Sequence, residues 1–153
     1  AGVLVQRRAG CDLVSYLTPR LFAPLGIQRP TWETDPLGYT FGAGGLFLCV
    51  TELGKFGQLL LQKGEWEGRQ LVPREYLEQA TAKQVENGEE GYGYLFWRGK
   101  DNSYRADGKY GQYAIVLEEE GLLLACNAQC PQQRELLDFL LRERHGLLKS
   151  CCE

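Results

Sequence analysis

The 153-residue sequence has no methionine and only one histidine, and none of its apolar runs approaches the roughly 20 residues of a transmembrane helix. A membrane span is therefore excluded. The net charge of −3 is unclustered apart from residues 118–120, so the basic patch that nucleic-acid binding requires is missing. With 44% hydrophobic and 24% charged residues, the composition is that of a globular protein.

The amino end also lacks the features of an export signal. In residues 1–8 the two arginines follow the apolar stretch, which reverses the order found in a signal peptide. The missing methionine and a first residue that reads as mid-helix together suggest a chain cut from something longer. Because this length supports one hydrophobic core, we expect all of residues 1–153 to belong to one domain or a part of one.

The six cysteines do not form a recognisable framework; they are Cys11, Cys49, Cys126, Cys130, Cys151 and Cys152. A disulfide scaffold would space them more densely. The spacer between Cys126 and Cys130 is longer than that of a zinc knuckle, and His145 is the only imidazole, so we predict no metal site. Cys49 and Cys126 are expected in the core and the last two exposed, which favours a reducing, cytoplasmic location.

Residues 1–90 are predicted to be helical or loop-like. Apolar spacing and helix breakers predict helices over 11–17, over 20–25, from Thr51 to a C′ glycine at Gly64, and over 72–82. Residues 28–45 combine glycine and proline with aromatic side chains and are predicted to be a loop. Such aromatics can line a pocket or simply anchor the loop to the core.

Residues 91–130 change to a strand pattern. The apolar runs at 92–97, 112–117 and 122–127 are β-rich, and the short connection at 118–121 makes the last two a hairpin. Residues 131–146 then carry leucines on one helical face and charges on the other. Helices, three or so antiparallel strands and a covering carboxy-terminal helix make an α+β fold.

Five segments of the sequence occur in an order that resembles a known family. They are residues 16–27 (YLTPRLFAPLGI), 42–46 (GAGGL), 56–64 (FGQLLLQKG), 91–94 (GYGY) and 106–113 (ADGKYGQY). In order and spacing they resemble the serine β-lactamase-like family, which includes class C β-lactamases, penicillin-binding DD-peptidases and related esterases. The resemblance spans residues 1 to about 144 and implies the carboxy-terminal portion of a β-lactamase/transpeptidase-like domain.

The family's catalytic motifs are absent from this chain. Enzymes of the family acylate the serine of a Ser-x-x-Lys motif, and the lysine and a Tyr-x-Asn tyrosine move protons. None of Ser15, Ser103 and Ser150 has a lysine three residues on, and no tyrosine is followed by x-Asn. The family places both motifs upstream of residues 16–27, so the resemblance implies a truncated chain, not a degenerate one.

The family's third motif, a Lys-Thr-Gly or His-x-Gly box on the substrate strand, falls within this chain. By position it reads Ala106, Asp107 and Gly108, so the cationic or imidazole residue is replaced by alanine. Gly108 keeps the small residue that lets a substrate backbone lie close. The resemblance implies that the N–H of Lys109 is one of two oxyanion donors. It further implies a pocket wall that combines these four residues with Trp32, Tyr39 and Gly44.

The resemblance implies a bacterial serine hydrolase that opens an ester or amide through an acyl-serine. Ala106 argues against anchoring a β-lactam carboxylate, so an ester or peptide-like substrate is favoured over an antibiotic. Without a nucleophile this polypeptide alone is expected to be inactive. The alternative is a non-catalytic binding module on the same scaffold. No cofactor is expected, because the chemistry needs none and the sequence has no nucleotide-binding or metal motif. A missing amino-terminal portion, or self-association, is expected to cover an unpaired sheet edge.

Overall fold

The computed structural model describes residues 1–28, 30–88, 90–99 and 101–150. Its helices are α1 (Gly2–Ala9), α2 (Leu13–Leu17), η1 (Thr18–Phe22), α3 (Val50–Leu61), α4 (Arg74–Thr81) and α5 (Gln133–Ser150). Its strands are β1 (Thr31–Trp32), β2 (Leu46–Phe47), β3 (Glu65–Trp66), β4 (Arg69–Gln70), β5 (Val85–Asn87), β6 (Glu90–Tyr92), β7 (Trp97–Arg98), β8 (Tyr104–Gly108), β9 (Gln112–Leu117) and β10 (Leu122–Asn127). No helix of this described part is long and apolar enough to cross a lipid bilayer.

The largest element is a sheet of six antiparallel strands in the order β10-β9-β8-β7-β6-β5. The predicted hairpin is confirmed, with Leu117 of β9 opposite Leu122 of β10. The sheet is larger than the three or so strands predicted from residue 91 onward. Its strand β5 lies at 85–87, before the predicted boundary at residue 90, because three exposed residues are too few to show an alternating pattern.

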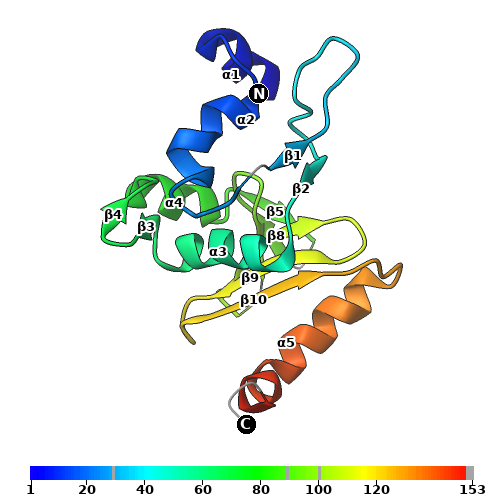
Figure 1. Cartoon of the computed structure of the whole chain (residues 1–153). Coiled ribbons are helices and arrows are strands. Elements are labelled where there is room, and N and C mark those ends of the chain that lie inside the picture. The colour runs from blue at the N-terminus through cyan, green and yellow to red at the C-terminus, as the bar shows by residue number, and fades with distance from the viewer. Residues whose placement is uncertain (29, 89, 100, 151–153) are drawn as a thin grey trace.

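Helix α3 covers one face of this sheet (Figure 1). Leu60 of α3 packs in one buried cluster with Tyr104 of β8 and Val116 of β9. The helix lies very close to the sheet, because a Cβ added at Gly57 would lie 2.3 Å from a methyl carbon of Leu123. The apolar stripe predicted for this helix is thus the face that meets the sheet.

Helix α5 covers the opposite face. Its Leu137 packs against Tyr113, Ile115 and Leu117 of β9, and the Tyr113 hydroxyl donates a hydrogen bond to the carbonyl of Gln133 at 2.8 Å. The helix begins two residues later than the predicted start at 131. The α+β class, the antiparallel sheet and the covering helix are confirmed, and the layers run α3, sheet, α5.

The amino-terminal helices form a third cluster with α3. Phe22, Leu25 and Ile27 are buried together with Leu59 of α3. Helix α2 passes directly into η1, where the N–H of Ala23 donates to the carbonyl of Thr18 at 2.8 Å in π-helical spacing. The predicted separation between the helices over 11–17 and 20–25 is therefore absent. An added π-turn accommodates a proline, which has no N–H of its own.

Cys49 is exposed and not in the core as predicted. It is the N-cap of α3, where its N–H donates to a carboxylate oxygen of Glu52 at 2.9 Å and its sulfur accepts from the backbone of the same residue. A polarisable sulfur replaces the usual hydroxyl in this capping box. Cys126 is half-buried under α5. Cys151 and Cys152 lie outside the described residues.

Candidate functional site

The candidate site begins on strand β8, whose residues alternate between the two faces of the sheet. The Tyr104 hydroxyl donates to the carbonyl of Leu60 on α3 at 3.1 Å, so Tyr104 points to the α3 face. By alternation Ala106 and Gly108 share that face. Asp107 lies on the α5 face, opposite Tyr113 of β9. Within the predicted box, Ala106 and Gly108 therefore lie on the α3 face and the Asp107 carboxylate on the α5 face.

Gly108 is covered by one neighbour across the hairpin. It lies opposite Gln112, and a Cβ added at Gly108 would come within 2.9 Å of both Cβ and Oε1 of that glutamine. The Gln112 amide is held in place because its Nε2 donates to the carbonyl of Ala128 at 2.7 Å. The requirement for glycine at this position is thus a close side-chain approach, which only glycine accommodates.

The turn after Gly108 is exposed and held from one side. The N–H of Tyr110 donates to Oε1 of Gln133 at 2.9 Å, and the N–H of Cys130 donates to the carbonyl of Tyr110 at 2.8 Å. Lys109 extends its ammonium group over the Tyr110 ring, 4.7 Å from the centroid. Among the described residues, none accepts a hydrogen bond from the N–H of Lys109. This donor is therefore available to a ligand.

The other three predicted site residues lie in or beside the segment 33–45, here called the glycine loop. The Trp32 indole N–H donates to the carbonyls of Phe41 at 3.0 Å and Gly44 at 2.8 Å. The same indole packs against the Phe22 and Leu25 cluster. Trp32 thus anchors the loop to the core, which is the second of the two roles expected for the loop aromatics.

Sequence reasoning missed the residue that fixes the loop from the other side. Gln6 of α1 is buried, its Oε1 accepts from the N–H of Thr40 at 2.9 Å, and its Nε2 donates to the Thr40 carbonyl at 3.2 Å. The Thr40 hydroxyl in turn accepts from the N–H of Leu13 at 3.3 Å. A glutamine between an apolar run and two arginines gives no sequence signal for this contact across 34 residues.

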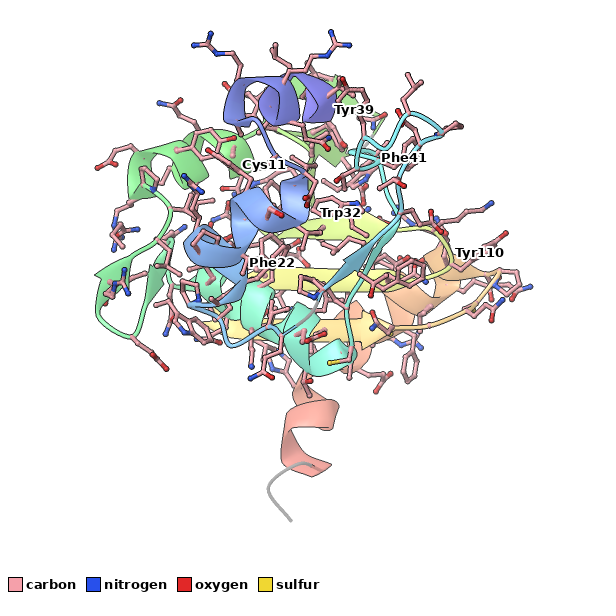
Figure 2. All side chains as sticks on the ribbon, turned by 45° about the horizontal axis from the view of Figure 1, so that its top comes forward. Cys11, Phe22, Trp32, Tyr39, Phe41 and Tyr110 are labelled. Atoms are coloured by element: carbon pink, nitrogen blue, oxygen red, sulfur yellow. The ribbon has the colours of Figure 1, made fainter. Side chains whose placement is uncertain are left out.

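Tyr39 lines a shallow hollow of about 310 Å³ between the loop and the first two helices. Its hydroxyl accepts a hydrogen bond from Nε of Arg7 at 3.2 Å, and the guanidinium also lies over its ring. Figure 2 shows Tyr39 beside α1, with Tyr110 away from it at the β8–β9 turn. No hydrogen bond or ion pair between described residues joins the Tyr39 hollow to the end of β8.

One contact does connect the two regions through the scaffold. Nδ2 of Asn127, the last residue of β10, donates to the carbonyl of Leu48 at 3.0 Å, between β2 and α3. Trp32 of β1 lies opposite Leu46 of β2. This hydrogen bond links the end of the sheet to the segment that follows β2. Among the described residues, no polar contact joins Trp32, Tyr39 or Gly44 to Ala106 or Gly108.

The titratable groups near β8 divide into two kinds. Burial raises the pKa of Tyr104 to about 12 despite the nearby Arg98, so this phenol stays neutral and does not act as a base. Burial alone would raise the pKa of Glu90, but hydrogen bonds and the charge of Arg105, with Arg134, hold it below its usual value. No group of three or more His, Cys, Asp or Glu side chains among the described residues is arranged to hold a metal ion.

No protein-family model matches the sequence, and a search of curated proteins finds no significant match. Solved structures do match. A putative 6-aminohexanoate-dimer hydrolase from Bacillus anthracis superposes with a TM-score of 0.82 at 20% identity, covering 97% of this chain and 42% of that one. A β-lactamase from Mycobacterium bovis gives 0.67 at 20% identity, covering 93% and 60% respectively. The octameric penicillin-binding protein homologue from Pyrococcus abyssi gives 0.58 at 18% identity, covering 92% and 40%.

The predicted resemblance is confirmed at the level of the fold. The chain has the fold of the β-lactamase and penicillin-binding-protein-like hydrolases, and it spans between 40% and 60% of the length of the structures it matches. The chain therefore corresponds to part of such a domain.

Proposed function

We propose that this chain forms part of a serine hydrolase that opens an ester or amide through an acyl-serine. The observation that carries the proposal is the end of β8 in this fold: two small residues, Ala106 and Gly108, face α3 beside an exposed turn whose Lys109 N–H is unpaired among the described residues. A strand end whose own residues are small and which has a free donor suits an extended substrate and its developing oxyanion.

In this proposal the chain supplies one half of the reaction site. Gly108 lets the substrate backbone lie against the strand, and the Lys109 N–H donates to the oxyanion. The nucleophile, its lysine and the proton-transferring tyrosine come from residues outside this chain. Losing one oxyanion donor costs about 2.7–4 kcal/mol of transition-state stabilisation, and losing the nucleophile removes the acyl-enzyme altogether. The 153 residues alone are therefore inactive.

The substrate proposed is a small ester, amide or peptide, in preference to a β-lactam. Ala106 provides no cation or imidazole for the carboxylate that a β-lactam carries. The structural match with a TM-score of 0.82 is described as a putative 6-aminohexanoate-dimer hydrolase, a name that refers to a linear amide. Both observations support the same substrate class.

The test uses the complete protein that contains this chain, assayed with a p-nitrophenyl ester, a linear amide dimer and a chromogenic β-lactam. We expect turnover of the ester or amide. We also expect kcat/KM to fall at least about 100-fold for Gly108→Val, because the valine side chain would meet Gln112 and the bound substrate. Gly54→Ala is the matched control, because a Cβ there meets Ala125 at an ordinary 3.8 Å. Equal activity of the two variants, or turnover of the β-lactam alone, contradicts the proposal.

The second candidate is a non-catalytic binding module. It is favoured by Ala106 at the cationic position of the box and by the absence of a Ser-x-x-Lys motif from these residues. The coding sequence upstream of Ala1 separates the two. A Ser-x-x-Lys followed by a Tyr-x-Asn supports the enzyme, and a native start at Ala1 supports the module.

A further inference from the structure

Behind the candidate site lies a chain of four charged side chains, three of which are largely buried. Arg105 of β8 has a side chain that is 6% exposed and points to the α5 face. Its Nε donates to Oδ2 of Asp107 at 2.9 Å. Its Nη2 and Nη1 donate to the two carboxylate oxygens of Glu90 on β6, at 3.0 Å and 3.4 Å. One guanidinium thus holds two carboxylates from two strands.

The chain of charges continues to α5. Nη1 of Arg134 donates to Oε1 of Glu90 at 3.2 Å, so helix and sheet share this carboxylate. The Trp97 ring, opposite Arg105 on β7, lies 5.5 Å from the guanidinium carbon. We call Asp107, Arg105, Glu90 and Arg134 the far-face network. Two of these four groups are positive and two are negative.

This network lies directly behind the residues proposed to meet substrate. Asp107 stands between Ala106 and Gly108 in the sequence, and adjacent strand residues point to opposite faces. We infer that Asp107 and Arg105 are positioning residues: from the α5 face they fix the β8 segment whose other face carries Ala106 and Gly108, and Asp107 does not contact substrate. The inference rests on the proposed function for the identity of the site, but the positioning itself is a property of this chain.

A purely stabilising role explains these residues less well. Replacing a buried ion pair by apolar residues of similar size is often neutral or stabilising, so burial of the three charges of Arg105, Asp107 and Glu90 is a poor source of stability alone. The position opposite Arg105 on β9 is Ile115, which shows that apolar packing suits this face. What the guanidinium supplies is fixed geometry, because three directed hydrogen bonds hold the Arg105 side chain to Asp107 and to Glu90 of β6.

The first test measures backbone hydrogen exchange in this chain at residues 108–112 and at 113–117, beside the free energy of unfolding in urea. The variants are Asp107→Ala, Asp107→Asn and Arg105→Lys. Glu120→Gln is the matched control, because Glu120 also pairs with an arginine, Arg144 at 2.8 Å, but at the far β9–β10 turn.

We expect Asp107→Ala and Arg105→Lys to raise exchange at 108–112 at least about ten-fold more than at 113–117. Asp107→Asn should stay within about three-fold of the parent chain, since its amide oxygen still accepts from Arg105. If Asp107→Ala does not fold, the contrast between Asp107→Asn and Arg105→Lys carries the test. The inference is overturned if exchange rises equally in both segments in proportion to the loss of global stability. It is also overturned if Asp107→Asn and Arg105→Lys exchange equally fast at 108–112.

The second test measures kinetics in the complete protein. A positioning role predicts that Asp107→Ala lowers kcat about 10- to 100-fold with KM little changed, and that Asp107→Asn restores most of it. A substrate-contact role predicts a raised KM in both variants, and that result overturns the inference. If the complete protein has no hydrolase activity, the proposed function fails, whereas the exchange result still decides whether the network positions β8.

Discussion

The side-chain amide of Gln6 pairs with both backbone groups of Thr40, as one strand pairs with another. Gln6 is 4% and Thr40 3% exposed, so no water replaces these hydrogen bonds if they are lost. The pairing fixes the middle of the glycine loop to α1. It makes the loop a defined structure instead of a mobile cover.

Replacing Gln6 by leucine tests this pairing. Leucine fills similar space but leaves the N–H and carbonyl of Thr40 unpaired, and each unpaired buried group costs about 1–3 kcal/mol. We expect Gln6→Leu to lower the free energy of unfolding by about 2–4 kcal/mol in urea titrations. Gln79→Leu, on the exposed side of α4, is the control and should change it little. Equal stabilities of the two variants would show that the pairing is not maintained in solution.

Substitutions at two glycines near the β3–β4 hairpin distinguish the cost of backbone strain from the cost of a steric clash. Gly64 has φ 84°, and a Cβ there would lie 2.1 Å from the carbonyl oxygen of Val72. Gly68 has φ 75° but meets nothing within 4 Å. Gly68→Ala should therefore lose only about 1–2 kcal/mol, the cost of the left-handed backbone for alanine. Gly64→Ala should lose at least twice as much in thermal or urea unfolding, and similar losses would contradict the close approach seen here.

The lowered pKa of Glu90 predicts how the free energy of unfolding changes at acid pH. Its pKa in the folded chain lies below the ordinary 4.5, although burial opposes the shift, because Arg105 and Arg134 favour the carboxylate. The unfolded chain thus binds this proton more readily than the folded one, so the contribution is complete above pH 4.5 and is lost as pH falls through the folded pKa. The measurement is the free energy of unfolding of parent and Glu90→Gln chains from pH 7 down to pH 3.

The parent chain should be the more stable at pH 7, with the difference shrinking below about pH 4.5. Glu86→Gln is the control, because its ion pair with Lys83 is largely exposed and contributes little. A difference between parent and Glu90→Gln chains that stays constant over the whole range would refute the account of this carboxylate.

Strand β10 is the last strand at its end of the described sheet and consists of Leu122 to Asn127 without a charged residue. An uncharged edge of this kind offers its free backbone groups to another strand. We expect the 153 residues alone to self-associate with rising concentration in analytical ultracentrifugation, and to do so less when the remaining part of the domain is supplied. A compact monomer at high concentration would argue against an open edge.

The parts of the fold that could be predicted are those with a local cause. The α3 stripe, the 112–127 hairpin and the positive φ at Gly64 all follow from spacing, turn chemistry and breaker residues. Strand β5 could not be predicted, because its residues are exposed and pair only with β6. Cys49 was assigned to the core because it is flanked by apolar residues, while its actual role depends on Glu52 three residues later.

The candidate site divides in the same way. That Ala106 and Gly108 share a face follows from strand alternation, and so does the opposite direction of Asp107. That Asp107 is held by Arg105, and Arg105 by Glu90, depends on the order of strands in the sheet, which local patterns do not determine. The Gln6 contact to Thr40 likewise requires the tertiary fold.

The most direct test of the central claim treats the 153-residue chain and the complete protein with a p-nitrophenyl ester in parallel, and locates any acyl adduct by mass spectrometry. The account predicts no burst and no adduct on the 153 residues, including Ser15 and Ser103, and a stoichiometric adduct in the complete protein on a serine of a Ser-x-x-Lys motif outside them. Stoichiometric acylation of the 153-residue chain, or a complete protein that is never acylated, would contradict it.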